Sequence, residues 1–232
     1  MSAPSPEEGA GERRPSILET LAARYGRAPV DIPPEADGVV RAMPVILRIE
    51  RDPLPGRTAL LEAAAQAALA VCVEPEPEWE EPLRRWVDGR IRKIARRARG
   101  AHWAAVQELP GVTVEVDGAQ ARALLPGPVD DVPKIVSRLQ IGGTELPPDD
   151  PGPAGSPIIV LNPAVDMTLG KAAAQVGHAS MILAAVRGWT TAPRFHVRRD
   201  PALWAEAAGT GVEVRDAGFT EVDPGTVTCR AW

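Results

Sequence analysis

The sequence predicts an α/β fold: a tandem pair of small mixed-sheet domains with flanking helices, arranged as an intramolecular pseudo-dimer. Three observations lead to this prediction. An apolar run followed by an Ala-rich helix occurs near residue 44 and again near residue 157. The segments after each helix recur in the same order. A Gly-, Pro- and Asp-rich stretch at 142–156, which cannot continue a helix or a central strand, separates the two halves.

The chain therefore divides into four parts. They are a flexible or wrapping N-terminal arm at 1–42, a first α/β unit at 43–141, the linker at 142–156 and a second α/β unit at 157–232. Within the arm, one short helix is expected at about Ser16 to Tyr25, because prolines and glycines keep the surrounding segments extended.

Composition limits the class of protein. Hydrophobic residues make up 44% of the 232 residues and charged residues 25%, which is ordinary for a globular protein with a sizeable core. No apolar run is long enough to span a membrane, and the N-terminus lacks a basic-then-apolar signal pattern. Two isolated cysteines, Cys72 and Cys229, are too few for a disulfide framework or a metal site. We expect a reduced, cytoplasmic protein that contacts no membrane.

The net charge of −5 argues against a nonspecific nucleic-acid binder. One basic concentration runs from Arg84 to Arg99, and phosphates of a nucleic acid could contact it. Five glutamates between Glu74 and Glu81 precede it directly. Pairing between the two groups is the stronger expectation.

The elements of the first unit follow from local patterns. The predicted strands are 44–50 and 112–116, the predicted helices are 57–70 and 102–108, a short charged strand or helix covers 90–97, and a turn lies at 126–127. Set beside the second unit, Pro44 corresponds to Pro157, Gly56-Arg57 to Gly170-Lys171, Trp86 to Trp189, and Gly111 to Gly211. The order is preserved from end to end, which favours a duplication over two unrelated βα units.

The stretch with the most chemistry lies at 167–180, after the strand predicted at 157–161. Lys171, Gln175 and His178 stand at i, i+4 and i+7, so they share one face of a helix. The residues between them are small and apolar, which suits packing against a sheet. Taken singly, a lysine at the position of Lys171 is most often a solvated first-turn residue, and a histidine like His178 is often half-buried and hydrogen-bonded.

A second motif, within the predicted strand–turn–strand at 212–228, completes a resemblance. Met-x-x-Gly-Lys-x-x-Ala-Gln-x-x-His-Ala followed by Asp-Ala-Gly-x-Thr is similar to the type II peptidyl-tRNA hydrolase family. The matching residues are Met167, Gly170, Lys171, Ala174, Gln175, His178, Ala179, Asp216, Ala217, Gly218, Thr220, Pro224 and Gly225. The resemblance covers about residues 157–232, and two motifs in the correct order are more specific than either alone.

The resemblance implies hydrolysis of the ester that joins a peptide to the terminal ribose of tRNA. Such a reaction needs an aligned water, a base and a group that stabilises the oxyanion. His178 is a natural base, while Asp216 either orients that histidine or acts as the base itself. Lys171 would contact the oxyanion or a phosphate, and Gln175 and Thr220 would hold substrate or water.

The first unit has lost this chemistry, since the positions of Gln175 and His178 fall on Leu61 and Ala64. The expected protein is therefore a monomer with peptidyl-tRNA as its partner and one active half. The sequence lacks metal-ligand spacing, a P-loop and G-x-S-x-G, so no metal, cofactor or covalent serine intermediate is expected. The alternative is a non-catalytic tRNA- or protein-binding module, in which Asp216 to Gly218 form only a capped turn.

Overall fold

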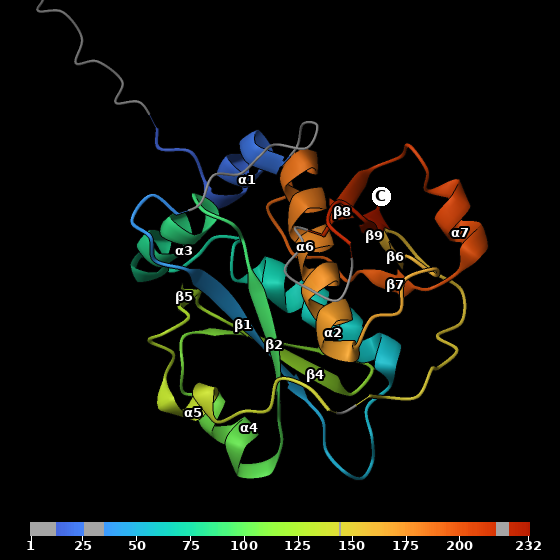
Figure 1. Cartoon of the computed structure of the whole chain (residues 1–232), viewed down its shortest axis with the longest axis horizontal. Helices are drawn as coiled ribbons and strands as arrows, with labels where there is room; N and C mark the ends of the chain where they lie inside the picture. Colours follow the sequence, from blue (N-terminus) through green and yellow to red (C-terminus); the bar gives the residue numbers. More distant parts are fainter. Residues whose placement is uncertain (1–12, 26–34, 144, 217–222) are drawn as a thin grey trace, which may run out of the picture.

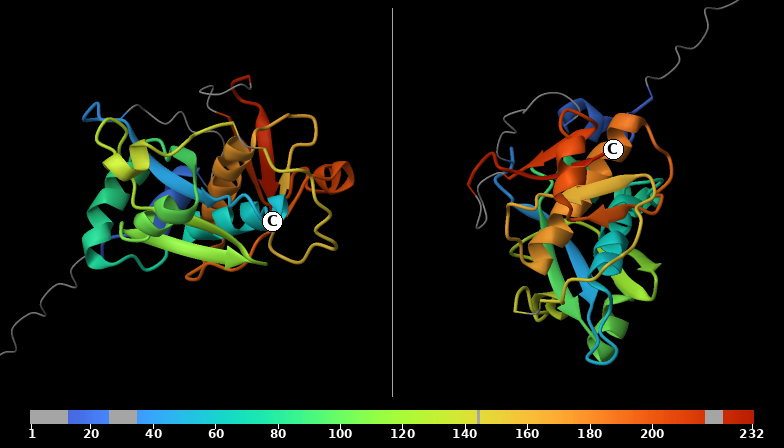
Figure 2. Two further views of the ribbon diagram at one scale, coloured as in Figure 1. Left: turned by 90° about the horizontal axis from the view of Figure 1, so that it is seen from below. Right: turned by 90° about the vertical axis from the view of Figure 1, so that its right-hand side faces the viewer.

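The computed structural model describes residues 13–25, 35–143, 145–216 and 223–232 (Figure 1). In that part the chain is a mixed α/β protein with two mixed sheets and seven α-helices. Two long helices, α2 (Arg57–Ala70) and α6 (Leu169–Arg187), lie between the two sheets (Figures 1 and 2).

The first sheet has the strand order β2-β1-β4-β3. Its central strand β1 (Arg41–Arg48) runs parallel to β2 (Lys93–Ala98) and antiparallel to β4 (Ala119–Leu124). The outer strand β3 (Gly111–Val116) pairs with β4, and the two-residue β5 (Gly127–Pro128) pairs with the start of β1.

The second sheet repeats this arrangement with the order β7-β6-β9-β8. Strand β6 (Ile158–Leu161) runs parallel to β7 (His196–Arg198) and antiparallel to β9 (Val227–Ala231), and β8 (Val212–Arg215) pairs with β9. Strands β1, β2, β3 and β4 of the first sheet therefore occupy the same places as β6, β7, β8 and β9 of the second. In both sheets the first of these strands is inside the sheet with its parallel neighbour on one side, and the fourth lies between the first and the third.

The two long helices join the halves into one core. Helix α2 packs on β3 and β4 of its own sheet and on β7 of the other, while α6 packs on β8 and β9 and on β2 of the first sheet. The helices also contact each other along their small residues, and Ser180 Oγ donates a 2.7 Å hydrogen bond to the carbonyl oxygen of Ala65. One continuous hydrophobic cluster therefore includes residues from both sheets.

The remaining helices are short and peripheral. Helix α1 (Ile17–Tyr25) packs on α6 and on α3 (Glu80–Val87), and its Ile17, Leu18 and Leu21 are buried. The helical part of the N-terminal arm thus contributes to the core. Helices α4 (Gly100–Val106) and α5 (Lys134–Ser137) cover a second, smaller apolar cluster, a 3-10 turn (Pro77–Trp79) precedes α3, and α7 (Pro201–Glu206) follows β7.

The linker holds the start of both long helices. Asp149 accepts hydrogen bonds from the backbone N–H and the hydroxyl of Thr58, in the first turn of α2. Glu145 accepts from the backbone N–H of Leu169 in the first turn of α6 and from the guanidinium of Arg57. Carboxylates are favourable at helix N-termini, so the linker stabilises both helices as well as connecting the two halves.

Most predicted elements are present. The helix at 57–70 is confirmed, and the segment at 90–97, left open between helix and strand, contains strand β2. Strand β4 and helix α3 are among the elements that the sequence did not predict: β4 is rich in alanine, which has a weak strand propensity, and α3 begins within an acidic, Pro-containing run. The short elements β5, α5, β7 and α7 were not predicted either. Among the described residues, no helix is both long and apolar enough to cross a membrane.

Candidate functional site

The two sequence motifs meet at the start of α6. Lys171 lies in the first turn of this helix, which Thr168 caps by accepting a hydrogen bond from the Lys171 backbone N–H. Asp216 follows β8, and its backbone N–H donates to the carbonyl of Thr226 across the hairpin. Lys171 Nζ lies 3.2 Å from Asp216 Oδ2, and the two side chains are only 7% and 3% exposed. A cation and a carboxylate that stand 45 positions apart in the sequence thus form a nearly buried ion pair.

Gln175, one turn further along α6, is directed to the hairpin as well. Its side chain is buried, and its Oε1 accepts a 2.7 Å hydrogen bond from the hydroxyl of Thr228 in β9. Gln175 is therefore not an exposed helix residue. The sequence did not single out Thr228, because a threonine in a strand carries no signal that separates it from an ordinary strand former.

His178 turns toward the other half of the molecule. Its Nδ1 lies 3.2 Å from Nζ of Lys93, which projects from β2 of the first sheet. Burial and the neighbouring Lys93 both lower the pKa of His178 well below its ordinary value, so the imidazole is neutral at physiological pH. Sequence reasoning missed Lys93, which is one of eight basic residues between 84 and 99 and has no distinguishing spacing.

Lys93 is an unusual lysine in its own right. Burial lowers its pKa to about 7, and its ammonium group lies 5.1 Å from the centre of the Trp86 ring. Trp86 itself is held by a 3.0 Å hydrogen bond from its indole Nε1 to the carbonyl of Arg92. Aromatic faces attract cations, so Trp86 partly offsets the loss of solvent around the amine.

The three helix residues therefore contact three different elements. Lys171 pairs with the residue that follows β8, Gln175 with β9, and His178 with β2. At 1.5 Å of rise per residue, His178 lies about 10 Å along the helix axis from Lys171. The remaining candidate, Thr220, together with Ala217 and Gly218, lies outside the described residues.

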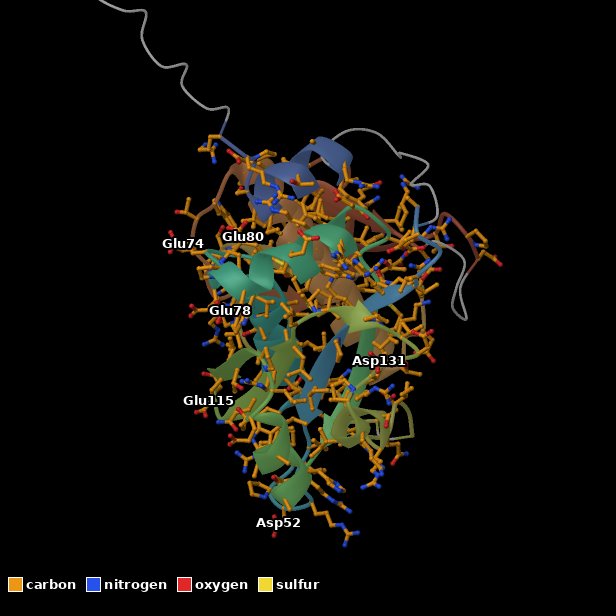
Figure 3. All side chains as sticks on the ribbon, turned by 90° about the vertical axis from the view of Figure 1, so that its left-hand side faces the viewer. Asp52, Glu74, Glu78, Glu80, Glu115 and Asp131 are labelled. Atoms are coloured by element: carbon orange, nitrogen blue, oxygen red, sulfur yellow. The ribbon has the colours of Figure 1, made fainter. Side chains whose placement is uncertain are left out.

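The basic concentration at 84–99 is extensively engaged within the protein. Arg84 and Arg85 pair with Glu80 and Glu81 at 3.2 and 2.8 Å, as the charge pattern predicted. Figure 3 shows Glu74, Glu78 and Glu80 gathered on the outer side of this region. Further along, Arg96 donates to the carbonyl of Leu139, and Arg97 to the side chain of Gln140. Arg96 and Arg97 also line a small pocket beside the first turn of α6.

Within the described ranges, no group of three or more His, Cys, Asp or Glu side chains is arranged to hold a metal ion. No protein-family model, curated protein or solved structure matches this chain. The residues themselves therefore carry the functional argument.

Proposed function

We propose that this protein hydrolyses the ester bond of peptidyl-tRNA and releases a peptide and free tRNA. The observation that carries the proposal is the ion pair between Lys171 and Asp216, with 3.2 Å between Nζ and Oδ2. These residues belong to the two motifs that resemble the type II peptidyl-tRNA hydrolases. A nearly buried cation beside a carboxylate provides the two groups that ester hydrolysis needs, a proton acceptor and a stabiliser of the oxyanion.

In the proposed reaction, the Asp216 carboxylate accepts a proton from a water molecule whose oxygen attacks the ester carbonyl. Lys171 donates a hydrogen bond to the oxyanion that forms on the carbonyl oxygen. The bond between the carbonyl carbon and the ribose oxygen then breaks, and the ribose oxygen takes the proton from Asp216. Water is consumed, and a ribose hydroxyl and a peptide carboxylic acid are formed; the acid then releases its proton to solvent and becomes the carboxylate.

The surroundings of the pair support this assignment. The buried hydrogen bond between Gln175 and Thr228 ties α6 to β9, beside the hairpin that carries Asp216. This contact fixes the spacing between helix and hairpin, and such preorganisation is worth several kcal/mol in catalysis. His178 lies two turns away from Lys171 and already contacts Lys93, which favours Asp216 over His178 as the base.

We also propose that the fold is a duplication, with an active unit at 157–232 and a degenerate unit at 43–141. The equal strand orders support it, and so do Gly111 and Gly211. A side chain at Gly111 would collide with the carbonyl oxygen of Ala123, and one at Gly211 with that of Ala231. Two glycines at the same place in two sheets indicate the same close approach of neighbouring strands.

The strand registers refine the internal alignment. Ala123 pairs with Val45, and Ala231 pairs with Ile159. Val45 and Ile159 are therefore equivalent, which shifts the sequence correspondence of Pro44 with Pro157 by one residue. Val45 also pairs with Ala95, and Ile159 with Val197. It follows that Arg96-Arg97 corresponds to Arg198-Arg199.

The first unit lacks an ion pair equivalent to that of Lys171 and Asp216. Arg57, at the position of Lys171, pairs with Glu145 of the linker, while Asp117 pairs with Arg194 of the second unit. Both charges are used to hold the halves and the linker together. We accordingly propose that the first unit is structural and that the chain is a cytoplasmic monomer with an internal pseudo-dimer.

The test is peptide release from an N-blocked aminoacyl-tRNA by the purified full chain, with the free aminoacyl-tRNA as the control substrate. The proposal expects catalytic release of the blocked amino acid. The alternative, a non-catalytic tRNA- or protein-binding module, would bind without any release. A wild-type protein that releases nothing rejects the hydrolase assignment.

A further inference from the structure

We propose that Lys93, supplied by the degenerate half, is a positioning residue for His178: it donates to Nδ1 and keeps the imidazole proton on Nε2, which then donates a hydrogen bond to the substrate. The substrate contact rests on the hydrolase function proposed above. The pairing of Lys93 with His178 stands on geometry alone.

The first argument is the chemistry of the two groups. A lysine ammonium carries donors and no acceptor, whereas a neutral imidazole has one nitrogen of each kind. While Lys93 is protonated, the 3.2 Å contact between Lys93 Nζ and His178 Nδ1 requires Nδ1 to be the acceptor, and the ring proton then lies on Nε2. A proton on both ring nitrogens would make the imidazole a cation that faces the ammonium directly. The imidazole therefore stays neutral and keeps only one ring proton.

The second argument is the space made for Lys93. A side chain at Gly177 would lie only 3.0 Å from Lys93 Cδ, 3.1 Å from Cε and 3.2 Å from Cβ of Ala68. Glycine inside a helix costs about 1 kcal/mol relative to alanine. Here it allows the Lys93 stem to pass between α6 and α2 and reach the residue that follows, His178.

The third argument comes from the duplication. With Arg96 equivalent to Arg198, the place of Lys93 is taken by Phe195 in the other half. The place of His178 is taken by Ala64, counted from Gly56-Arg57. Phe195 and Ala64 are both fully buried. In the other half, both members of the polar pair are thus replaced by apolar residues. This joint replacement is expected if Lys93 and His178 act together.

Other charged groups do not explain the contact. In the part of the chain that the structure describes, no carboxylate lies within ion-pair distance of Lys93. Its titratable neighbours are His178 from α6 and Cys72 just after α2, whose pKa is raised to about 12 by burial, so that the thiol stays neutral. Trp86 of α3 contributes only its ring face.

The first test follows the imidazole directly and needs no tRNA. In the ¹⁵N-labelled full chain, long-range ¹H–¹⁵N spectra from pH 5 to 9 report the tautomer and titration of each histidine. Below pH 7, where Lys93 carries its proton, His178 is expected as the neutral Nε2–H tautomer. Lys93→Met should remove the tautomer preference and let His178 titrate at higher pH, while Lys93→Arg should keep both properties. Arg96→Met, on the same strand, is the control that should change neither.

The second test measures peptide release. His178→Gln keeps a donor close to the position of Nε2 and is expected to stay within about tenfold of the wild type, whereas His178→Ala should lose about a hundredfold or more. Lys93→Met should lose at least about tenfold, because the wrong tautomer cannot donate, and Lys93→Arg should recover much of that loss.

The outcomes separate the two proposals. An Nδ1–H tautomer in the wild type below pH 7, or a His178 that is unchanged by Lys93→Met, overturns the role of Lys93 whether or not the protein is a hydrolase. If His178→Gln is as slow as His178→Ala, the imidazole acts as a base and the donor role is wrong. Absence of release by the wild type, with the expected spectra, rejects the hydrolase function and with it the substrate contact.

Discussion

Glu62 of α2 and Arg198 of β7 form a buried ion pair across the two halves, with 3.2 Å between Oε1 and Nη1, although 136 positions separate them in the sequence. The same carboxylate accepts from the backbone N–H of Val197 and from the guanidinium of Arg194. Glu62 is 1% exposed. One acidic side chain thus satisfies several donors of the opposite sheet and fixes where α2 docks.

We expect Glu62→Ala to lower the free energy of unfolding by about 3–5 kcal/mol, because it leaves the buried Arg198 charge without its carboxylate. Urea denaturation of the full chain measures this. The control is Glu81→Ala, which removes an exposed partner of Arg85 and should scarcely move the midpoint. Equal effects of the two substitutions would contradict the role given to Glu62.

Asp216→Asn should reduce peptide release by about a hundred- to ten-thousandfold, because it removes the proposed proton acceptor. Lys171→Met should also reduce it strongly, through loss of the oxyanion contact. Since Asp216→Asn removes the carboxylate of a nearly buried ion pair, rates are compared per folded molecule, with melting measured in parallel. Glu213→Gln in β8, whose carboxylate pairs with Arg215 and Arg230, is the matched control and should release peptide normally. Wild-type turnover in Asp216→Asn would exclude it as the base.

The stability of the protein should rise from about pH 7 to about pH 8.5. The unfolded chain keeps the Lys93 proton up to its ordinary pKa of 10.5, whereas the folded lysine, buried, has a pKa of about 7. Between these values the unfolded state binds more protons, so the free energy of unfolding increases with pH. The pH range of this rise ends below pH 9.0. Near that pH the thiols of Cys72 and Cys229 ionise in the unfolded chain but not in the folded one, which lowers the free energy of unfolding as the pH increases.

Urea denaturation at several pH values in this window tests the pH dependence. Lys93→Met should flatten the slope, and Arg96→Met should leave it unchanged. A slope that persists in Lys93→Met would show that another group titrates.

The second unit should depend on the first for its folding. Expressed alone, residues 157–232 lack α2, which packs along α6 through contacts such as Ser180 with Ala65. The buried small-residue face of α6 would then be exposed. Sedimentation should show a monomeric full chain, and a fragment that is unfolded or self-associated. A well-folded, monomeric fragment with full activity would contradict the need for the first unit.

The sequence by itself determined the main elements of each half and the local grouping of the site. Helical periodicity and alanine content gave α2 and the start of α6, and the spacing of Lys171, Gln175 and His178 placed them on one helix face. The Gly- and Pro-rich segment at 142–156 marked the junction between the halves. These features depend on neighbours within a few turns, which is why a pattern in the sequence reveals them.

The tertiary structure alone decided the partners of those residues. At about 100° per residue, Lys171, Gln175 and His178 are spread over about 60° around the helix. Within that spread Gln175 contacts Thr228 and His178 contacts Lys93. These partners depend on the docking of α6 between the two sheets. The same docking buries Lys93 and Glu62, and it lowers the pKa of Lys93 to about 7, although in the sequence this lysine is one of many basic residues. Long-range packing and desolvation produce these properties, and neither has a local signature in the chain.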